Sequence, residues 1–179
     1  TKAHRVLADH GRAMTFLVAD GVTPSNEGRG YVLRRVIRRA VVHGRDLGLE
    51  SFLPSLAGVV VEQMGGVYPE LVEQREAIGQ VLAAEEEKFG ETLARGLKLF
   101  EEAAAKGAVS GEDAFTLQAT YGFPVEMTAE LAREQGLAVD LNEFQGLMAE
   151  HREVSRAGTG GGAGVERAAG FVRAAGFQT

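Results

Sequence analysis

The chain has 179 residues, a net charge of −6, 45% hydrophobic residues and no cysteine, which is typical of one sizeable globular domain or two small ones. The lack of cysteine excludes disulfides and thiolate metal sites, and four histidines without a His-Glu-x-x-His motif argue against a zinc site. No apolar run approaches the ~18 residues of a membrane helix, and no signal-peptide pattern opens the sequence, so we expect a cytoplasmic location and no membrane partner.

Positive charge is concentrated in the first part of the chain. Residues 1–50 hold 9 Lys/Arg and 5 Asp/Glu, a net charge of +4, whereas residues 51–179 hold 10 Lys/Arg and 20 Asp/Glu, a net charge of −10. A local basic face matters more for binding a polyanion than the total charge does. A nucleic-acid site, if the chain has one, is therefore expected within residues 1–50.

These fifty residues predict two helices joined by a loop. Residues 2–18 have the apolar spacing of an amphipathic helix, and its His10 is expected to be packed or hydrogen-bonded rather than to act as a ligand or base. Glycines, a proline and a Ser-Asn pair leave no helical period over residues 20–30. A second helix is predicted over residues 31–47.

The second helix has two different faces. At about 100° per residue, its apolar side chains fall on one side and four basic ones fall on the opposite arc, namely Arg34, Arg35, Arg38 and Arg39. Like charges four residues apart repel by a few tenths of a kcal/mol, so stability alone would favour acids at some of these positions. A polyanionic partner would favour all four arginines, but a solvated charged face explains the spacing equally well.

The loop before this helix favours a binding function. It places Asn26, whose amide both donates and accepts hydrogen bonds, at the start of the basic helix. Backbone N–H groups near Gly28 and Gly30 would point at an anion at the helix N-terminus. A P-loop is excluded because no Gly-Lys-Ser/Thr follows the glycines, and a dinucleotide fingerprint is excluded because position 33 is leucine and no strand precedes it.

An acidic region follows. Residues 53–64 predict a short helix, and Pro69 fits the first position of the next. From there an acidic helix is expected to extend to about residue 106, either unbroken or bent near Gly90. Its glutamates, including the run at residues 85–87, are expected to form a solvated face, while its apolar stripe packs as a strut against the basic unit.

Three shorter helices are predicted after it. Ser110 is expected to cap the first, with Asp113 completing a capping box. The second covers residues 128–135. The third covers residues 143–156 and is capped by an Asp or Asn at position 140 or 142.

No segment alternates apolar and polar residues for long enough to predict a sheet. The predicted fold class is therefore all-α: a multi-helix bundle with one long acidic helix and one arginine-rich helix. We divide the chain into a helical unit over residues 1–157 and a Gly/Ala-rich linker or tail over residues 158–179.

Several of these segments resemble alanyl-tRNA synthetase. The resemblance lies in ADHGR (8–12), FLVADGV (16–22) and PSNEGRGYVLRR (24–35), with a shorter match at TYGFP (120–124). The resemblance covers roughly residues 5–156. This region is similar to the part of that family that follows the class II catalytic core and binds the tRNA acceptor stem. The resemblance implies the tRNA-binding part of a ligase that attaches alanine to its tRNA in protein synthesis.

The resemblance also implies site residues. The family identifies its tRNA mainly through a G·U wobble pair, third in the acceptor stem, and side chains read base edges in the open minor groove of an A-form duplex. In this sequence Asn26 would read the pair, and the tRNA backbone would be bound by Arg29, Arg34, Arg35, Arg38 and Arg39. The family pairs this asparagine with an aspartate from further along the chain. The nearest candidate position precedes TYGFP, where this chain has Gln118-Ala119 and so departs from the pattern, which makes Ala119 the candidate second reading position, with Asp113 and Asp140 as alternatives.

Other parts of the parent enzyme are implied to hold its chemistry. The class II adenylation motifs and the zinc-dependent editing motif match nothing in this chain, so we expect no catalytic residue, metal or cofactor here. Sites for ATP, Mg and zinc would lie elsewhere. The expected partners are the acceptor stem of alanine tRNA and the catalytic and editing domains of the parent chain. The alternative is an all-α protein-interaction module whose basic helix docks on an acidic partner, which leaves the Asn26 loop unexplained.

Overall fold

The computed structural model describes residues 1–158, and these residues form helices and no strand. The helices are α1 (Lys2–Ala19), α2 (Gly28–Arg45), α3 (Leu53–Met64), α4 (Pro69–Glu73), α5 (Arg75–Ala104), α6 (Gly111–Ala119), α7 (Val125–Glu134) and α8 (Leu141–Gly158). The predicted all-α class is confirmed. The predicted linker or tail lies outside the described residues, apart from its first position.

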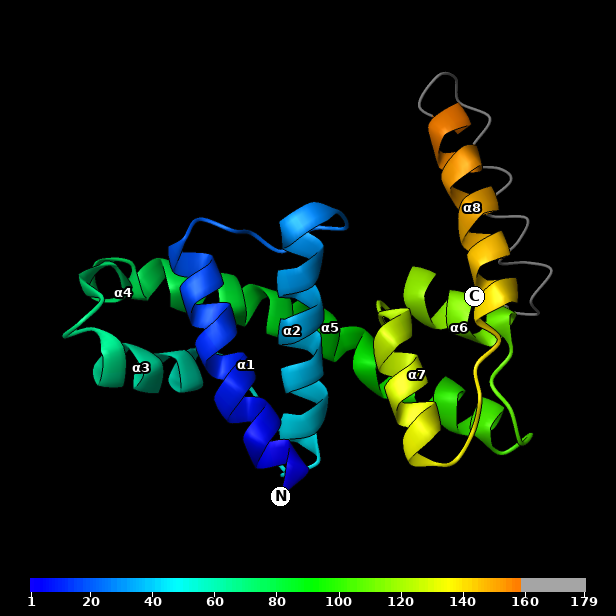
Figure 1. Cartoon of the computed structure of the whole chain (residues 1–179), viewed down its shortest axis with the longest axis horizontal. Coiled ribbons are helices and arrows are strands. Elements are labelled where there is room, and N and C mark those ends of the chain that lie inside the picture. The colour runs from blue at the N-terminus through cyan, green and yellow to red at the C-terminus, as the bar shows by residue number, and fades with distance from the viewer. Residues whose placement is uncertain (159–179) are drawn as a thin grey trace.

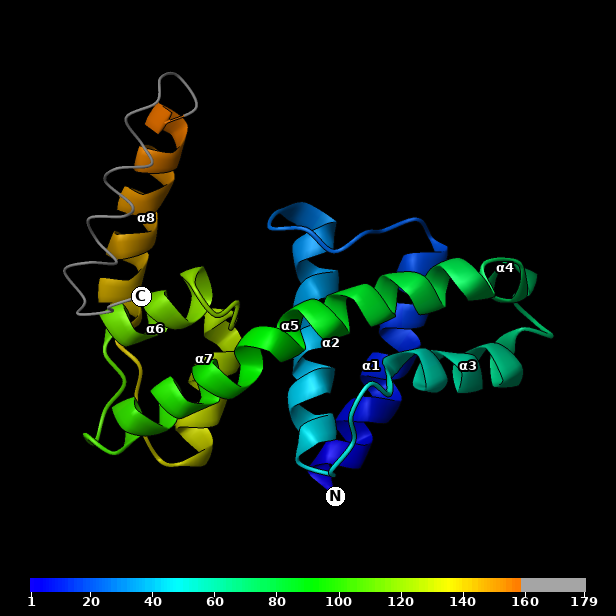
Figure 2. The same cartoon turned by 180° about the vertical axis from the view of Figure 1, so that it is seen from behind.

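Helix α5 connects the two ends of the molecule. It has 30 residues, and Figures 1 and 2 show it crossing the molecule, with α1 to α4 on one half and α6 to α8 on the other. The arginine-bearing α2 packs on α1 and on α5, while α6 packs on α5, α7 and α8. None of the helices within residues 1–158 is long and apolar enough to cross a membrane.

Apolar residues at helical spacing build the core along α5. The fully buried ones recur at steps of four or seven residues: Ile78, Leu82, Phe89, Leu93 and Phe100. This is the stripe expected of an amphipathic helix that packs on neighbours along its whole length. Burying each such side chain stabilises the fold by about 1.5–3 kcal/mol.

Most predicted helix boundaries lie within three residues of those in the structure, with one exception. Helix α3 has the predicted bounds, and the capping box of Ser110 and Asp113 is formed. The long helix is interrupted at Gln74, which was not predicted, whereas α5 is continuous through Gly90. Gln74 Nε2 donates a hydrogen bond to the carbonyl oxygen of Ala19 at 2.9 Å. This contact with α1, distant in sequence, fixes the break.

The expected solvated face at residues 85–87 is wrong for two of its three glutamates. Glu85 and Glu86 are only 5% and 7% exposed, because both carboxylates have partners on other parts of the chain. Glu86 accepts hydrogen bonds from the backbone N–H groups of Phe52 and Leu53 at 3.0 and 3.1 Å, and so caps the start of α3. Burial raises the pKa of Glu86, and these two hydrogen bonds oppose that rise.

Candidate nucleic-acid interface

The loop between α1 and α2 carries Asn26 to the surface. Asn26 is exposed, one residue after Ser25, whose Oγ donates a hydrogen bond to the carbonyl oxygen of Glu27 at 2.8 Å. Gly30, in the first turn of α2, lies so close to the loop that a Cβ there would collide with Ser25. The loop is thus held compactly against the N-terminus of α2.

Arg34 ties this loop to α5. Its Nη1 donates to Asn26 Oδ1, its Nη2 donates to the carbonyl oxygen of Pro24 at 3.4 Å, and its Nε donates to Glu85 Oε1 at 3.0 Å. An amide oxygen has two lone pairs, so Asn26 keeps one lone pair and both amide N–H groups for a partner. Arg34 therefore orients the Asn26 side chain, and the exposed part of the amide can still bind a partner.

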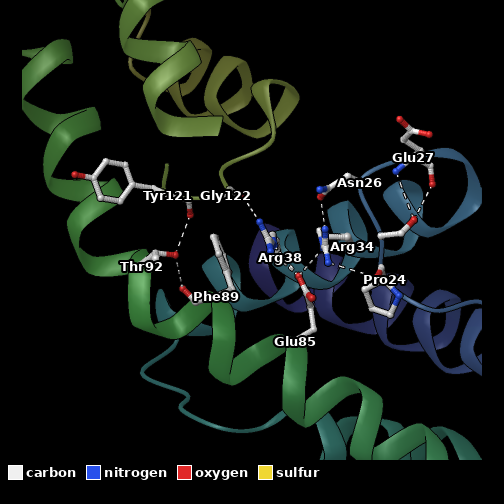
Figure 3. A network of polar contacts seen from close by, with 11 residues as sticks. Pro24, Asn26, Glu27, Arg34, Arg38, Glu85, Phe89, Thr92, Tyr121 and Gly122 are labelled. Carbon is white, nitrogen blue, oxygen red and sulfur yellow. Dashed lines mark hydrogen bonds and ion pairs between the residues drawn. The ribbon is translucent and has the colours of Figure 1, made fainter. Parts of the chain in front are cut away.

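Arg38 lies one turn further along α2 and is only 8% exposed. Its Nε donates to the same Glu85 Oε1 at 2.8 Å, its Nη1 donates to the carbonyl oxygen of Gly122, and its guanidinium carbon lies 5.0 Å from the Phe89 ring centroid. Burial lowers the pKa of Arg38, and the carboxylate of Glu85 opposes that effect. Figure 3 shows the resulting series of contacts from Asn26 through Arg34, Glu85 and Arg38 to Gly122.

The turn after α6 is held by α2 and α5 together. Gly122 has a φ of +71°, a conformation that favours glycine, and a Cβ at this position would also collide with the Arg38 guanidinium. On α5, Thr92 Oγ1 donates a hydrogen bond to the carbonyl oxygen of Tyr121 at 2.9 Å. Ala119, the last residue of α6, is exposed immediately before this turn.

Arg35 and Arg39 pair with α7 instead of α5. Arg35 Nη1 lies 3.3 Å from Glu126 Oε1. Arg39 makes a bidentate pair with Glu130, with distances of 2.7 Å from Nε to Oε2 and 2.6 Å from Nη2 to Oε1. Lys2 Nζ lies 2.7 Å from the same carboxylate. Burial raises the pKa of Glu130, but the hydrogen bonds from Arg39 and Lys2 outweigh it and lower the pKa to about 2.

Two further side chains of this region are hydrogen-bonded. His10 Nε2 lies 3.0 Å from Arg39 Nη1, which confirms the predicted hydrogen-bonded histidine, and burial followed by the charge of Arg39 lowers the pKa of His10. Tyr31 Oη donates to Glu126 Oε2 at 2.9 Å. Burial, together with the hydrogen bond to Glu126, raises the pKa of Tyr31 to about 12. His10 thus contacts Arg39 of the pair with Glu130, and Tyr31 contacts Glu126 of the pair with Arg35.

The five arginines expected to bind the tRNA backbone differ in accessibility. The side chain of Arg35 is 40% exposed, compared with 15% for Arg34, 29% for Arg39 and 9% for Arg38. Arg29 is exposed, and its side chain makes no hydrogen bond or ion pair within residues 1–158. The arginines therefore do not form one open arc, and a phosphate cannot reach Arg38, because Glu85, Gly122 and Phe89 already surround it.

Sequence reasoning missed the glutamates that pair with these arginines. Glu126 and Glu130 are four residues apart on α7, matching the spacing of Arg35 and Arg39 on α2, and that shared period was a signal available in the sequence. Glu85 has no such signal, since it lies within a run of acids. Within residues 1–158, no group of three or more His, Asp or Glu is placed to hold a metal ion.

Comparison with known proteins identifies the family. The chain matches the family model described as tRNA synthetases class II (A) over residues 1–173, so it belongs to this family. It is similar to proteins named alanine–tRNA ligase, and the matched segment is 57% identical over 162 residues in Pelotomaculum thermopropionicum (87% of this chain, 18% of the relative), 53% over 157 residues in Methylococcus capsulatus (86% and 18%) and 50% over 167 residues in Xanthomonas campestris pv. campestris (92% and 19%). The chain thus spans about a fifth of the length of these curated relatives.

Proposed function

We propose that this chain is the part of an alanine–tRNA ligase that recognises the acceptor stem of alanine tRNA. The observation that carries the proposal is the Asn26 loop, in which an exposed amide is oriented by Arg34 at the N-terminus of an arginine-rich helix. The relatives are named for the ligase activity. The parent enzyme would join alanine to tRNA in the cytoplasm, with its ATP, Mg and zinc sites in other domains.

Asn26 suits the chemistry of a G·U pair. In a G·U wobble the exocyclic amine of guanine lacks its usual partner, and the wide, shallow minor groove of A-form RNA presents it to side chains. The free lone pair of the Asn26 amide oxygen can accept a hydrogen bond from that amine, while the amide N–H groups can donate to a neighbouring acceptor. Because Arg34 already holds the amide, little orientational entropy is lost on binding.

Arg29 and Arg35 are the arginines best suited to bind the phosphates that flank this pair. Arg29 is exposed without a side-chain partner within residues 1–158, and Arg35 has only a solvent-exposed pair with Glu126 at 3.3 Å. Such exposed pairs contribute about 0–1 kcal/mol, so exchanging the carboxylate for a phosphate costs little. Arg34 and Arg39 are more enclosed and would contribute at longer range, whereas Arg38 makes no phosphate contact, because Glu85, Gly122 and Phe89 already surround it.

The second reading position is proposed at residue 119, where this chain has alanine, Ala119. It is exposed beside the turn at Gly122, which Arg38 connects to the same glutamate that holds the Asn26 loop. Its methyl group can accept no hydrogen bond, so the proposal assigns base-pair discrimination in this chain to Asn26. A carboxylate introduced at position 119 would add a second acceptor for the guanine amine.

Binding of a labelled acceptor-stem hairpin tests the proposal. The purified chain should bind the hairpin of alanine tRNA, measured by fluorescence anisotropy, and log K should fall against log salt by roughly 0.7–0.9 per phosphate contact. The alternative of a protein-interaction module predicts no RNA binding, and its acidic partner would compete with the glutamates that already hold Arg35 and Arg39. Absence of binding at low salt would reject the proposal.

A further inference from the structure

We propose that Glu85 is a positioning residue for base-pair recognition, because a single oxygen of its carboxylate, Oε1, fixes the Asn26 loop and the turn at Gly122 relative to each other. This inference rests on the proposed function, since it concerns the geometry of the same site. It assigns a role in specificity to a side chain that is only 6% exposed and cannot touch RNA itself.

Glu85 Oε1 is shared by two guanidinium groups. Arg34 Nε lies 3.0 Å from this oxygen, and Arg38 approaches it through both Nε at 2.8 Å and Nη2 at 2.7 Å. Hydrogen bonds between charged groups are roughly twice as strong as neutral ones, and exclusion of water strengthens them further. The carboxylate therefore holds Arg34 and Arg38 of α2 against α5.

The far side of each guanidinium holds one of the two recognition segments. Arg34 binds Asn26 Oδ1 and the carbonyl oxygen of Pro24, whereas Arg38 binds the carbonyl oxygen of Gly122. Figure 3 shows Glu85 as the only labelled residue that contacts both arginines. A displacement of Glu85 would therefore reach the two segments together, although 95 positions of sequence separate Asn26 from Tyr121.

Neighbouring residues of α5 complete this arrangement. Phe89, one turn after Glu85, stacks under the Arg38 guanidinium, and Thr92 donates to the carbonyl oxygen of Tyr121. One face of α5 thus contacts the turn directly through Thr92, and it reaches the turn through Arg38 and the loop through Arg34. Without the charge of Glu85, the two like-charged guanidinium groups would repel one another and Arg38 would be buried without a counter-ion.

Glu86 offers a matched control for testing Glu85. Both are buried glutamates of α5, but Glu86 caps α3 and touches neither recognition segment. Glu85→Gln and Glu86→Gln keep the side-chain size and remove one buried charge each. Arg38→Lys, which keeps a charge but loses the fork that joins Glu85 to Gly122, is a second variant in case Glu85→Gln does not fold.

Competition between two acceptor hairpins, one with G·U at the third pair and one with G·C, gives the first readout. In Glu85→Gln and in Arg38→Lys the preference for G·U should fall at least fivefold, the scale of a lost base contact, while the Kd for the G·C hairpin changes less. Glu86→Gln should keep the wild-type preference. A preference that survives in Glu85→Gln, or is lost equally in Glu86→Gln, would overturn the inference.

Amide hydrogen exchange without RNA gives a second readout that is independent of the proposed function. Glu85→Gln should accelerate exchange in residues 24–31 and in residues 120–123 together, whereas Glu86→Gln should accelerate it at residues 52–57. If wild-type protein shows no preference between the hairpins, the proposed function fails, and this exchange pattern alone decides whether Glu85 couples the two segments. Unchanged exchange in either segment of Glu85→Gln would refute the coupling.

Discussion

Arg35 and Arg38 are three positions apart on α2, but mutation of Arg35 should mainly weaken RNA binding, whereas mutation of Arg38 should mainly lower stability. Arg35→Gln removes a side chain that is 40% exposed and paired only with Glu126 at 3.3 Å, so the free energy of unfolding should fall by about 0–1 kcal/mol. Arg38→Gln leaves the buried carboxylate of Glu85 with one partner and the carbonyl oxygen of Gly122 without its donor. Breaking such a buried pair costs about 3–5 kcal/mol.

Thermal unfolding and RNA binding separate the two effects. For a chain of this size each kcal/mol lowers Tm by about 2–4 °C, so Arg38→Gln should melt about 6–20 °C below wild type and Arg35→Gln within about 4 °C of it. The thermal unfolding of both variants is followed by circular dichroism. In hairpin titrations at several salt concentrations, Arg35→Gln should reduce the slope of log K against log salt by roughly 0.7–0.9, the value of one phosphate contact.

Folded Arg38→Gln protein, measured well below its Tm, should keep the wild-type salt slope, because no phosphate reaches this side chain. The reasoning would be refuted if Arg38→Gln flattened the slope while Tm stayed unchanged. It would equally be refuted if Arg35→Gln lowered Tm by more than 10 °C without altering RNA binding.

Three further changes probe other parts of the site. Asn26→Ala should reduce the preference for a G·U hairpin over its G·C twin about tenfold, the scale of a good base contact, and an unchanged ratio in competition binding would limit the loop to a structural role. Ala119→Asp should raise that preference, and the same assay showing no change would assign the second reader to another position. Glu130→Gln should lower Tm at pH 7 because Arg39 and Lys2 hold the pKa of Glu130 at about 2, below its ordinary 4.5. That stabilisation is present above pH 4.5 and is lost as the pH falls toward 2, so the two melting curves should converge there, and a gap independent of pH would contradict the assignment.

Local patterns in the sequence are sufficient to predict most of the helices. The bounds of α3 follow from apolar spacing and a glycine pair, and the capping box of Ser110 and Asp113 follows from residue type alone. The break at Gln74 could not be predicted, because it depends on a hydrogen bond to Ala19, 55 residues away. A contact between residues so far apart cannot be recognised from a short segment of the sequence.

Contacts between residues distant in sequence also explain which features of the site could not be predicted. The position of Asn26 at the start of the basic helix follows from the loop composition, and the structure places it there, exposed. Arg34 and Arg38 are four residues apart without an intervening acid, so the sequence suggests unpaired charges, yet Glu85 lies 51 and 47 residues further along the chain and binds both. Which arginines face outward was therefore decided by the packing of α2 on α5.

The most direct test of the account is competition between two acceptor-stem hairpins that differ only at the third pair, one G·U and one G·C, for the wild-type chain. Equal lengths and equal salt cancel the phosphate contribution, so the ratio of Kd values reports base recognition alone. The account predicts a preference for G·U of about tenfold or more, the scale of one good base contact. Equal Kd values, with both hairpins bound in a salt-dependent way, would show a backbone-binding surface without base recognition and would contradict the role of Asn26.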